Sequence, residues 1–239
     1  MTEPRFYRWN VLFLLLGSLA AWPRATPAQA VAAEAPPAAT HYKGREIATT
    51  MHFHGAPWLV RESREREEDC KTLLRELDVR PGQVVCDMGC GNGFYTIELA
   101  RRVGPTGKVY AVDIQPEMLE LLKQRTRQLK LRNIVAVVGS PDNPRLPGET
   151  FDLVLLVDVY HEFSHPEEML RAIRRSLKPS GRIALVEFRA EDPAVPIKPL
   201  HKMSKAQILK ELPPNGFELV EQFDGLPWQH LMYFNKKEE

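Results

Sequence analysis

A short apolar segment of this chain runs directly into a glycine-rich loop. Residues 84–88 read VVCDM, which is typical of a buried strand, and residues 89–93 read GCGNG. Gly89, Gly91 and Gly93 permit positive φ angles and let a ligand approach the backbone without interference from a Cβ atom. A helical pattern follows, and the free N–H groups at a helix N-terminus favour negative charge. Strand, glycine turn and helix in this order predict an α/β fold with a ligand at the turn.

The rest of the chain alternates between strand and helix patterns. Further strands are expected at 108–113, 134–138, 151–157, 183–188, 217–223 and 231–235, and helices at 94–103, 116–129, 166–177 and from Ser204 to about 213. This alternation predicts a parallel sheet with right-handed crossovers and helices on both faces. Because ligands of such sheets bind outside the carboxyl ends of the strands, one crevice should collect residues 87–93, Asp113, residues 140–142 and residues 158–162.

Composition excludes several classes of protein. The chain has 239 residues, of which 44% are hydrophobic and 26% charged, enough for one sizeable core. A disordered, collagen-like or disulfide-framework protein does not fit these values. The formal net charge of +1 gives no electrostatic reason to expect a nucleic-acid partner. Cys70, Cys86 and Cys90 lack a metal-site spacing, so we expect reduced structural thiols, with a redox pair as the alternative.

The N-terminus has the pattern of an export signal. Arg5 and Arg8 precede an apolar run at 11–21, and residues 28–30 (AQA) provide a cleavage site. This run is shorter than the ~20 residues that a membrane-spanning helix needs. We therefore expect a signal peptide over residues 1–30, export to the periplasm or the cell exterior, and no transmembrane span after cleavage. An uncleaved membrane anchor is the alternative.

Three parts are expected after the signal peptide: an Ala/Pro-rich linker at 31–41, an N-terminal helical lid segment at 42–80 and the main domain at 81–239. Charges of both signs alternate over Arg61–Asp69, which predicts a solvated helix face. Trp58 and Trp228 are candidates for an apolar cover over the crevice, with ordinary packing as the alternative.

Two acidic residues flank the glycine loop. Asp87 directly precedes the loop, and Asp113 ends the next expected strand, where a carboxylate can accept hydrogen bonds from ribose hydroxyls. An anion at Asp87 would repel a pyrophosphate but suits a cationic ligand. The glycine spacing is G-x-G-x-G and differs from the dinucleotide fingerprint G-x-G-x-x-G. A nicotinamide dehydrogenase is therefore disfavoured.

These stretches resemble the class I S-adenosylmethionine-dependent methyltransferases. The resemblance spans roughly residues 70–235 and is carried by 84–100 (VVCDMGCGNGFYTIELA), 109–119 (VYAVDIQPEML), 151–163 and 176–188 (SLKPSGRIALVEF). It implies a three-layer, doubly wound Rossmann-like fold whose mostly parallel seven-stranded sheet has an antiparallel last strand. The implied cofactor is S-adenosyl-L-methionine (SAM). Residues 42–68 and 195–203 are similar to an exported bacterial branch of this family.

The resemblance also implies roles for individual positions. Asp87 and the loop glycines Gly89, Gly91 and Gly93 would face the methionine part of SAM. Asp113 would bind the ribose hydroxyls, and Ile114 would lie against the adenine. Ser140 stands where family members contact the adenine, although Gly139-Ser140-Pro141 departs from the commoner Gly-Asp. Asp158 would contribute to the cofactor site, and residues 158–162 occupy the substrate-facing position.

The candidate catalytic residues are His161, Glu162 and His201. His161 leaves the fourth strand beside the implied methyl donor, where an imidazole can orient or deprotonate an acceptor; a loop or cap histidine is the equal alternative. Glu162 is either a partner of that imidazole or a solvated acid. Residues 161–165 match the H-E-x-x-H of zinc proteases, but Pro166 restricts His165 away from helical geometry.

Other residues near the carboxyl ends of the strands allow a second interpretation. His201, His230 and Glu187 could form a pocket for a metal or an acceptor, but scattered rim histidines are the preferred interpretation, and no metal is predicted. The chain is thus predicted to methylate a small molecule or an envelope component. A non-catalytic protein of the same fold that binds SAM or its product is the alternative, because the predicted export separates the chain from cytosolic SAM. The acceptor and the oligomeric state stay open.

Overall fold

The computed structural model describes Met1 and residues 37–238. The expected signal peptide, apart from Met1, and most of the expected linker lie outside these described residues. Residues 37–238 belong to one compact unit, Ala35–Glu239. Within the described residues, no helix has the length and apolar character to cross a membrane.

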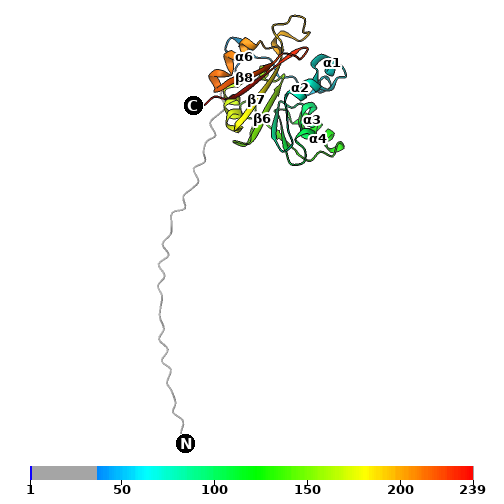
Figure 1. The fold of residues 1–239 in the computed structure, drawn as a ribbon, viewed down its shortest axis with the longest axis vertical. Coiled ribbons are helices and arrows are strands. Elements are labelled where there is room, and N and C mark those ends of the chain that lie inside the picture. Colours follow the sequence, from blue (N-terminus) through cyan, green and yellow to red (C-terminus); the bar gives the residue numbers. More distant parts are fainter. Residues whose placement is uncertain (2–36, 239) are drawn as a thin grey trace. The chain divides into compact units, whose positions relative to one another are not determined.

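A seven-stranded sheet forms the centre of this unit, with the strand order β5-β4-β3-β6-β7-β9-β8 (Figure 1). The strands are β3 (Val84–Met88), β4 (Lys108–Asp113), β5 (Ile134–Val138), β6 (Phe151–Val157), β7 (Leu177–Phe188), β8 (Phe217–Phe223) and β9 (Gln229–Lys236). Strands β3 to β7 pair in parallel, and β9 runs antiparallel between β7 and β8. The predicted fold and its antiparallel last strand are confirmed. The order reverses at β3 and β6, which places the ligand crevice at the carboxyl ends of these strands.

Helices cover both faces of the sheet. α2 (Cys70–Glu76), α3 (Phe94–Val103) and α4 (Pro116–Gln128) pack on one face, and α5 (Pro166–Ser176) and α6 (Lys205–Glu211) pack on the other. Successive side chains of a strand point to opposite faces. Leu153 and Leu155 of β6 therefore pack with α2 and α3, whereas Val154 and Leu156 pack with α5 and α6. This is why the run 153–157 is apolar throughout.

The segment 42–80 begins with a hairpin that the sequence analysis did not predict. β1 (His41–Tyr42) pairs with β2 (Arg45–Glu46) through a two-residue turn, in which Lys43 and Gly44 have φ angles of 48° and 93°. Tight hairpin turns require positive φ at these positions, which explains the glycine. A 3-10 helix (Phe53–Val60), α1 (Arg64–Glu68) and α2 follow.

The expectation of a solvated charged face over Arg61–Asp69 is wrong at two positions. Arg64 is 5% exposed and Glu68 is fully buried. The Arg64 guanidinium donates a 2.8 Å hydrogen bond to Glu68 and lies 4.3 Å from the centre of the Phe94 ring. Burial is tolerated here because each charge has a partner of opposite sign.

Strand β7 also differs from the expectation, since it starts at Leu177 and not at 183. Phe151 pairs with Leu177, and the next paired residues are Leu153 and Arg182, so residues 178–181 form an irregularity within the strand pair. The turn residues at 179–181 thus interrupt the pairing without ending the strand. The predicted helix start at Ser204 is confirmed, because the Gln207 N–H donates to the Ser204 hydroxyl at 3.1 Å.

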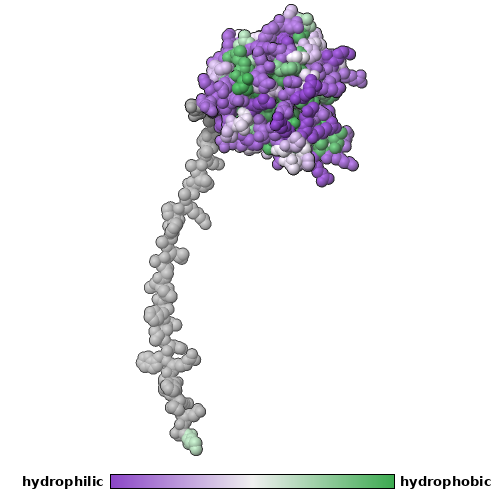
Figure 2. Space-filling model, in the orientation of Figure 1, coloured by the Kyte–Doolittle hydropathy of each residue, from purple (hydrophilic) through white to green (hydrophobic). Residues whose placement is uncertain are grey.

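The hydropathy of the surface and the state of the cysteines agree with what the composition predicts. The face shown in Figure 2 is mostly hydrophilic, and its apolar residues form small separate patches. Cys70, Cys86 and Cys90 are buried free thiols, as predicted.

Candidate functional site

The glycine loop lies tightly between two other segments at the carboxyl end of β3. Gly89 and Gly91 have φ angles of 68° and 53°. A Cβ atom on Gly89 would lie 2.3 Å from Val159, and one on Gly91 would lie 2.5 Å from Leu59. Since real Cβ contacts do not come this close, only glycine fits at both positions. The loop is thus enclosed by the residues after β6 and by the N-terminal 3-10 helix.

Asp113 holds the loop from the end of β4. Its Oδ2 accepts a hydrogen bond from the Gly91 N–H at 2.9 Å, and its Oδ1 accepts one from the Gln115 N–H at 2.9 Å. Burial raises the pKa of this carboxyl group. Each carboxylate oxygen can accept a second hydrogen bond, so Asp113 retains capacity for two hydroxyl donors. Ile114 follows and is 39% exposed, which leaves an apolar surface beside the carboxylate.

Asp87 lies beneath the first turn of α3. The carboxyl group is 3% exposed, and its Oδ2 accepts a hydrogen bond from the Thr96 hydroxyl at 2.5 Å. Burial raises the pKa of Asp87 to about 6. A nearby cation stabilises the charged form of a buried carboxyl group whose pKa is raised.

The shifted pKa of Asp87 predicts a pH-dependent stability. An acid with a raised pKa binds more protons in the folded than in the unfolded state, so stability falls as the pH rises from about 4 to about 6. The shift corresponds to a loss of about 3 kcal/mol that is complete above pH 6. We expect Asp87→Asn to lack this part of the decrease when urea unfolding is measured across that range. An equal pH dependence of both proteins would contradict the assignment.

Asp158 and Ser140 occupy their expected places with different surroundings. Asp158, directly after β6, is partly exposed, but its Oδ1 is buried and has no hydrogen-bond partner among the described residues; its Oδ2 accepts from the Gln229 side chain at 2.7 Å. Burial, together with the Glu68 and Glu187 charges, raises its pKa well above the usual value. The Ser140 hydroxyl donates to Asp142 at 2.7 Å within its own turn, so its hydroxyl proton is engaged locally.

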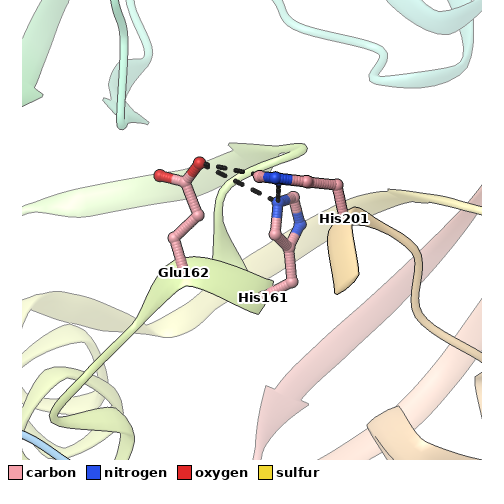
Figure 3. Close-up of side chains that lie close together, drawn as sticks. All are labelled: His161, Glu162 and His201. Carbon is pink, nitrogen blue, oxygen red and sulfur yellow. Dashed lines mark hydrogen bonds and ion pairs between the residues drawn. The ribbon is translucent and has the colours of Figure 1, made fainter. Parts of the chain in front are cut away.

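His161, Glu162 and His201 converge in space (Figure 3). His161 and Glu162 lie in a 3-10 helix (Tyr160–Glu162) after β6, and His201 ends another (Pro199–His201) after β7. His161 Nε2 lies 3.1 Å from His201 Nδ1, and its Nδ1 lies 2.7 Å from Glu187 Oε2. A Glu162 oxygen lies 3.9 Å and 4.0 Å from the two histidine nitrogens. The preferred expectation of scattered rim histidines is therefore wrong for His201.

The charges in this cluster influence one another. Burial raises the pKa of Glu162 to about 7. For His161, burial opposes the charged form, but the adjacent Glu187 carboxylate outweighs it and raises the pKa. Burial and the neighbouring His161 lower the pKa of His201. The buried His161–Glu187 pair thus faces a second imidazole and a second carboxyl group.

A short backbone segment connects the cluster to the glycine loop. The Met51 N–H donates to Glu162 at 3.2 Å, and the Met51 carbonyl accepts from the Gln115 side chain at 2.9 Å. The Gln115 backbone in turn donates to Asp113. These hydrogen bonds link Asp113, at the end of β4, to Glu162, which follows β6.

Two other histidines lie outside the cluster. His230 pairs in register with Glu187 across β7 and β9, yet its ring nitrogens form no hydrogen bond within the described part of the chain. His165 precedes α5 with a φ of −131°, while His161 lies in a separate 3-10 helix. The two histidines of the zinc-protease pattern therefore do not share a helix face, and that alternative is excluded.

Sequence reasoning missed several residues that shape the site. Gln115 and Gln229 position Met51 and Asp158, and neither carried a recognised motif. The sequence did offer a signal for Gln115: it lies two residues after Asp113 and directly before Pro116, which begins a helix. The sequence suggests Glu187 as a possible pocket residue with His201 and His230, but its 2.7 Å contact with His161 comes only from the structure.

Comparison with known proteins identifies the family. A family model described as a methyltransferase domain matches residues 80–236. The chain belongs to the class I SAM-dependent methyltransferases. A SAM-dependent methyltransferase from Aquifex aeolicus superimposes with a TM-score of 0.73 at 26% identity, covering 77% of this chain and 98% of that one. A putative type 11 methyltransferase from Sulfolobus solfataricus shares the fold, with a TM-score of 0.59, 20% identity, and 72% and 95% coverage.

Curated relatives are similar over part of their length. A ubiquinone/menaquinone biosynthesis C-methyltransferase from Salmonella arizonae is 33% identical over 148 residues, 62% of this chain and 57% of that protein. A demethylmenaquinone methyltransferase from Geobacillus is 30% identical over 114 residues, 48% of this chain and 49% of that protein. The chain thus spans only about half of the length of these relatives.

The residues of this methyltransferase fit SAM. Asp113 has acceptor capacity for two hydroxyls, and Ile114 offers an apolar surface beside it. Asp87 and the unpartnered Asp158 Oδ1 are buried acceptors suited to a cationic or N–H-bearing group. The roles of these individual residues toward SAM stay predictions.

Proposed function

We propose that this methyltransferase acts on a small hydroxylated aromatic molecule that binds against His161, Glu162 and His201. The position of this cluster carries the proposal, because it lies after β6 and β7 and is connected through Met51 and Gln115 to Asp113. In a doubly wound sheet, ligands bind at the carboxyl ends of the strands, so an acceptor at this cluster would lie beside a cofactor at Asp113.

Aromatic side chains near the same strand end support an aromatic acceptor. The Phe188 ring, at the end of β7, lies 6.5 Å from the rings of Trp58 and Trp228. Of these rings Phe188 is buried and Trp58 is 40% exposed, so Trp58 is the one that a flat acceptor ring can contact. The two curated relatives are named as a ubiquinone/menaquinone biosynthesis C-methyltransferase and a demethylmenaquinone methyltransferase, and a quinone in its reduced form is a hydroxylated aromatic ring. The chain shares the domain of those proteins and not their full length.

The chain's own side chains would orient the acceptor and accept its proton. The bound cofactor supplies an electrophilic methyl group, so the protein mainly has to align a nucleophile with it, which contributes ~7–11 kcal/mol in favourable cases. His161 Nδ1 faces Glu187, which places the ring proton there and leaves the Nε2 lone pair directed into the cluster. Without a bound ion, that lone pair faces His201 Nδ1 at 3.1 Å, and an acceptor hydroxyl that replaces this contact can donate to it.

Replacing His161 with alanine tests this proposal. We expect turnover to fall roughly 100-fold or more, since positioned acid–base groups contribute 10²–10⁴-fold, while SAM affinity stays within about 2-fold of the parent because Asp113 and the loop are untouched. Transfer to hydroquinone, catechol and naphthalenediol is followed by mass spectrometry, and SAM binding by calorimetry. His41→Ala, an exposed position in the hairpin, is the control.

Two results would contradict the proposal. Unchanged turnover in His161→Ala would remove the cluster from the reaction. SAM binding without transfer to any hydroxylated ring would remove the acceptor class and favour the non-catalytic alternative.

A further inference from the structure

We propose that His161 Nε2, His201 Nδ1 and a Glu162 oxygen form a binding site for one divalent transition-metal ion, with a position left open for an acceptor oxygen. The three atoms come from two 3-10 helices that follow β6 and β7, and all lie within 4.8 Å of one another (Figure 3). The use of the ion in catalysis rests on the function proposed above. The existence of the site does not.

The distances between the three donor atoms fit a single ion. They are 3.1 Å between the nitrogens and 3.9 Å and 4.0 Å from these to the Glu162 oxygen. A point equally distant from all three lies about 2.1 Å from each, which matches Zn–N distances of about 2.0–2.1 Å and Zn–O distances of about 2.0–2.2 Å. The three distances are therefore compatible with one shared ion.

Hydrogen bonds to its neighbours orient the His161 ring, as is usual for a metal-binding histidine. A ligating imidazole usually donates its other N–H to a carboxylate, which orients the ring. Glu187 provides this partner at 2.7 Å, and its second oxygen accepts the His161 backbone N–H at 3.2 Å. Arg45 donates to the His161 carbonyl at 2.9 Å. The ring is thus fixed with Nε2 directed toward His201.

The charges around the three atoms also suit a cation. Glu162 and Glu187 are both nearly removed from solvent, and in the described part of the chain neither forms an ion pair with a lysine or arginine. Arg45, a nearby cation, is paired with Glu211 at 2.7 Å. A divalent ion would balance the two carboxylates that face the cluster.

The ligand set indicates the class of metal and its use. Two imidazoles and one carboxylate suit Zn²⁺ and neighbouring first-row ions rather than Mg²⁺ or Ca²⁺, which prefer oxygen ligands. Three protein ligands leave a further position open, as in catalytic rather than structural zinc sites. A hydroxyl oxygen of the acceptor could occupy that position, where the ion would favour its deprotonated form.

Direct metal binding tests the site. The full chain, stripped with a chelator and dialysed, is titrated with Zn²⁺ by calorimetry, and bound Co²⁺ is followed by its visible absorption. We expect one ion per chain. His201→Ala and Glu162→Gln should weaken binding roughly 100-fold or more, beyond the 10–100-fold typical of outer-shell changes, while His41→Ala binds as the parent does. His201 is partly exposed, so its truncation should leave the fold intact, which circular dichroism checks.

The outcomes separate the metal site from the proposed function. Failure of the parent to bind Zn²⁺ or Co²⁺, or equal binding by His201→Ala and Glu162→Gln, overturns the metal site even where methyl transfer proceeds. Binding of one ion that both variants lose supports the site. The acceptor class is tested separately by methyl transfer itself, so it can fail while the metal site stands.

Discussion

Asp113→Ala is expected to weaken SAM binding by about two orders of magnitude or more. The carboxylate retains one acceptor position on each oxygen after bonding the Gly91 and Gln115 N–H groups. Two hydroxyl donors would fill these positions, and hydrogen bonds to a charged group contribute about 1.5–3 kcal/mol each. Since about 1.4 kcal/mol corresponds to a factor of ten in affinity, their loss exceeds 100-fold.

The substitution also removes a contact that shapes the loop. Without the carboxylate, the Gly91 N–H loses its acceptor, which adds to the loss of affinity. Calorimetric titration with SAM measures the effect. Glu120→Ala is the control, because Glu120 forms an exposed ion pair with Lys123 on α4 and should change SAM affinity less than about 3-fold. Equal SAM affinity of Asp113→Ala and the parent would remove Asp113 from the ribose site.

Glu68→Gln is expected to lower the free energy of unfolding by about 3–5 kcal/mol, the usual cost of removing one partner from a buried ion pair. The fully buried Glu68 accepts from Arg61 at 2.6 Å and from Arg64 at 2.8 Å. Glutamine keeps the size of the side chain but leaves the buried Arg64 guanidinium without a counter-charge, whereas Arg61 keeps its 2.7 Å pair with Glu67. Urea denaturation with a linear extrapolation gives the difference.

Glu65→Gln on the same helix provides the control for this measurement. Glu65 forms an exposed pair with Lys71 at 3.5 Å, and such pairs contribute only about 0–1 kcal/mol. A cost below about 1 kcal/mol for Glu68→Gln would show that the cluster is not a stabilising pair.

The Glu68 cluster also supports the site. Arg64 donates to the Leu59 carbonyl at 2.7 Å, and Leu59 packs against Gly91 of the glycine loop. Loss of Glu68 should therefore release the N-terminal 3-10 helix from the loop as well as destabilise the fold. The N-terminal segment thus packs against the glycine loop.

Local patterns in the sequence determined most of the sheet. Strands at 84–88, 108–113, 134–138, 151–157 and 217–223 have the predicted bounds, and the helix at 94–103 does as well. These predictions succeeded because each depends on neighbours in the chain: an apolar run, a glycine or proline turn, or a cap. The position of Asp113 at the end of the second of these strands then followed from strand length alone.

The hairpin and the start of β7 depended on more than local pattern. The two-residue strands of the hairpin are too short to show any alternation, and Arg45 anchors them through the distant Glu211. The turn residues at 179–181 interrupt β7 without ending it, because Leu177 still finds a partner in Phe151. In both cases a residue far along the chain decides the outcome.

The sequence by itself determined the fold class, the glycine loop and the acid opposite it, because turn chemistry and periodicity are properties of adjacent residues. Only the tertiary structure brought His201 to His161, 40 residues away, and placed Glu187 behind that ring. It also decided that Arg64 and Glu68 are buried rather than solvated. The physical reason is that burial and charge pairing depend on which segments pack together, and a charged or imidazole side chain has no periodic pattern that reveals its partner.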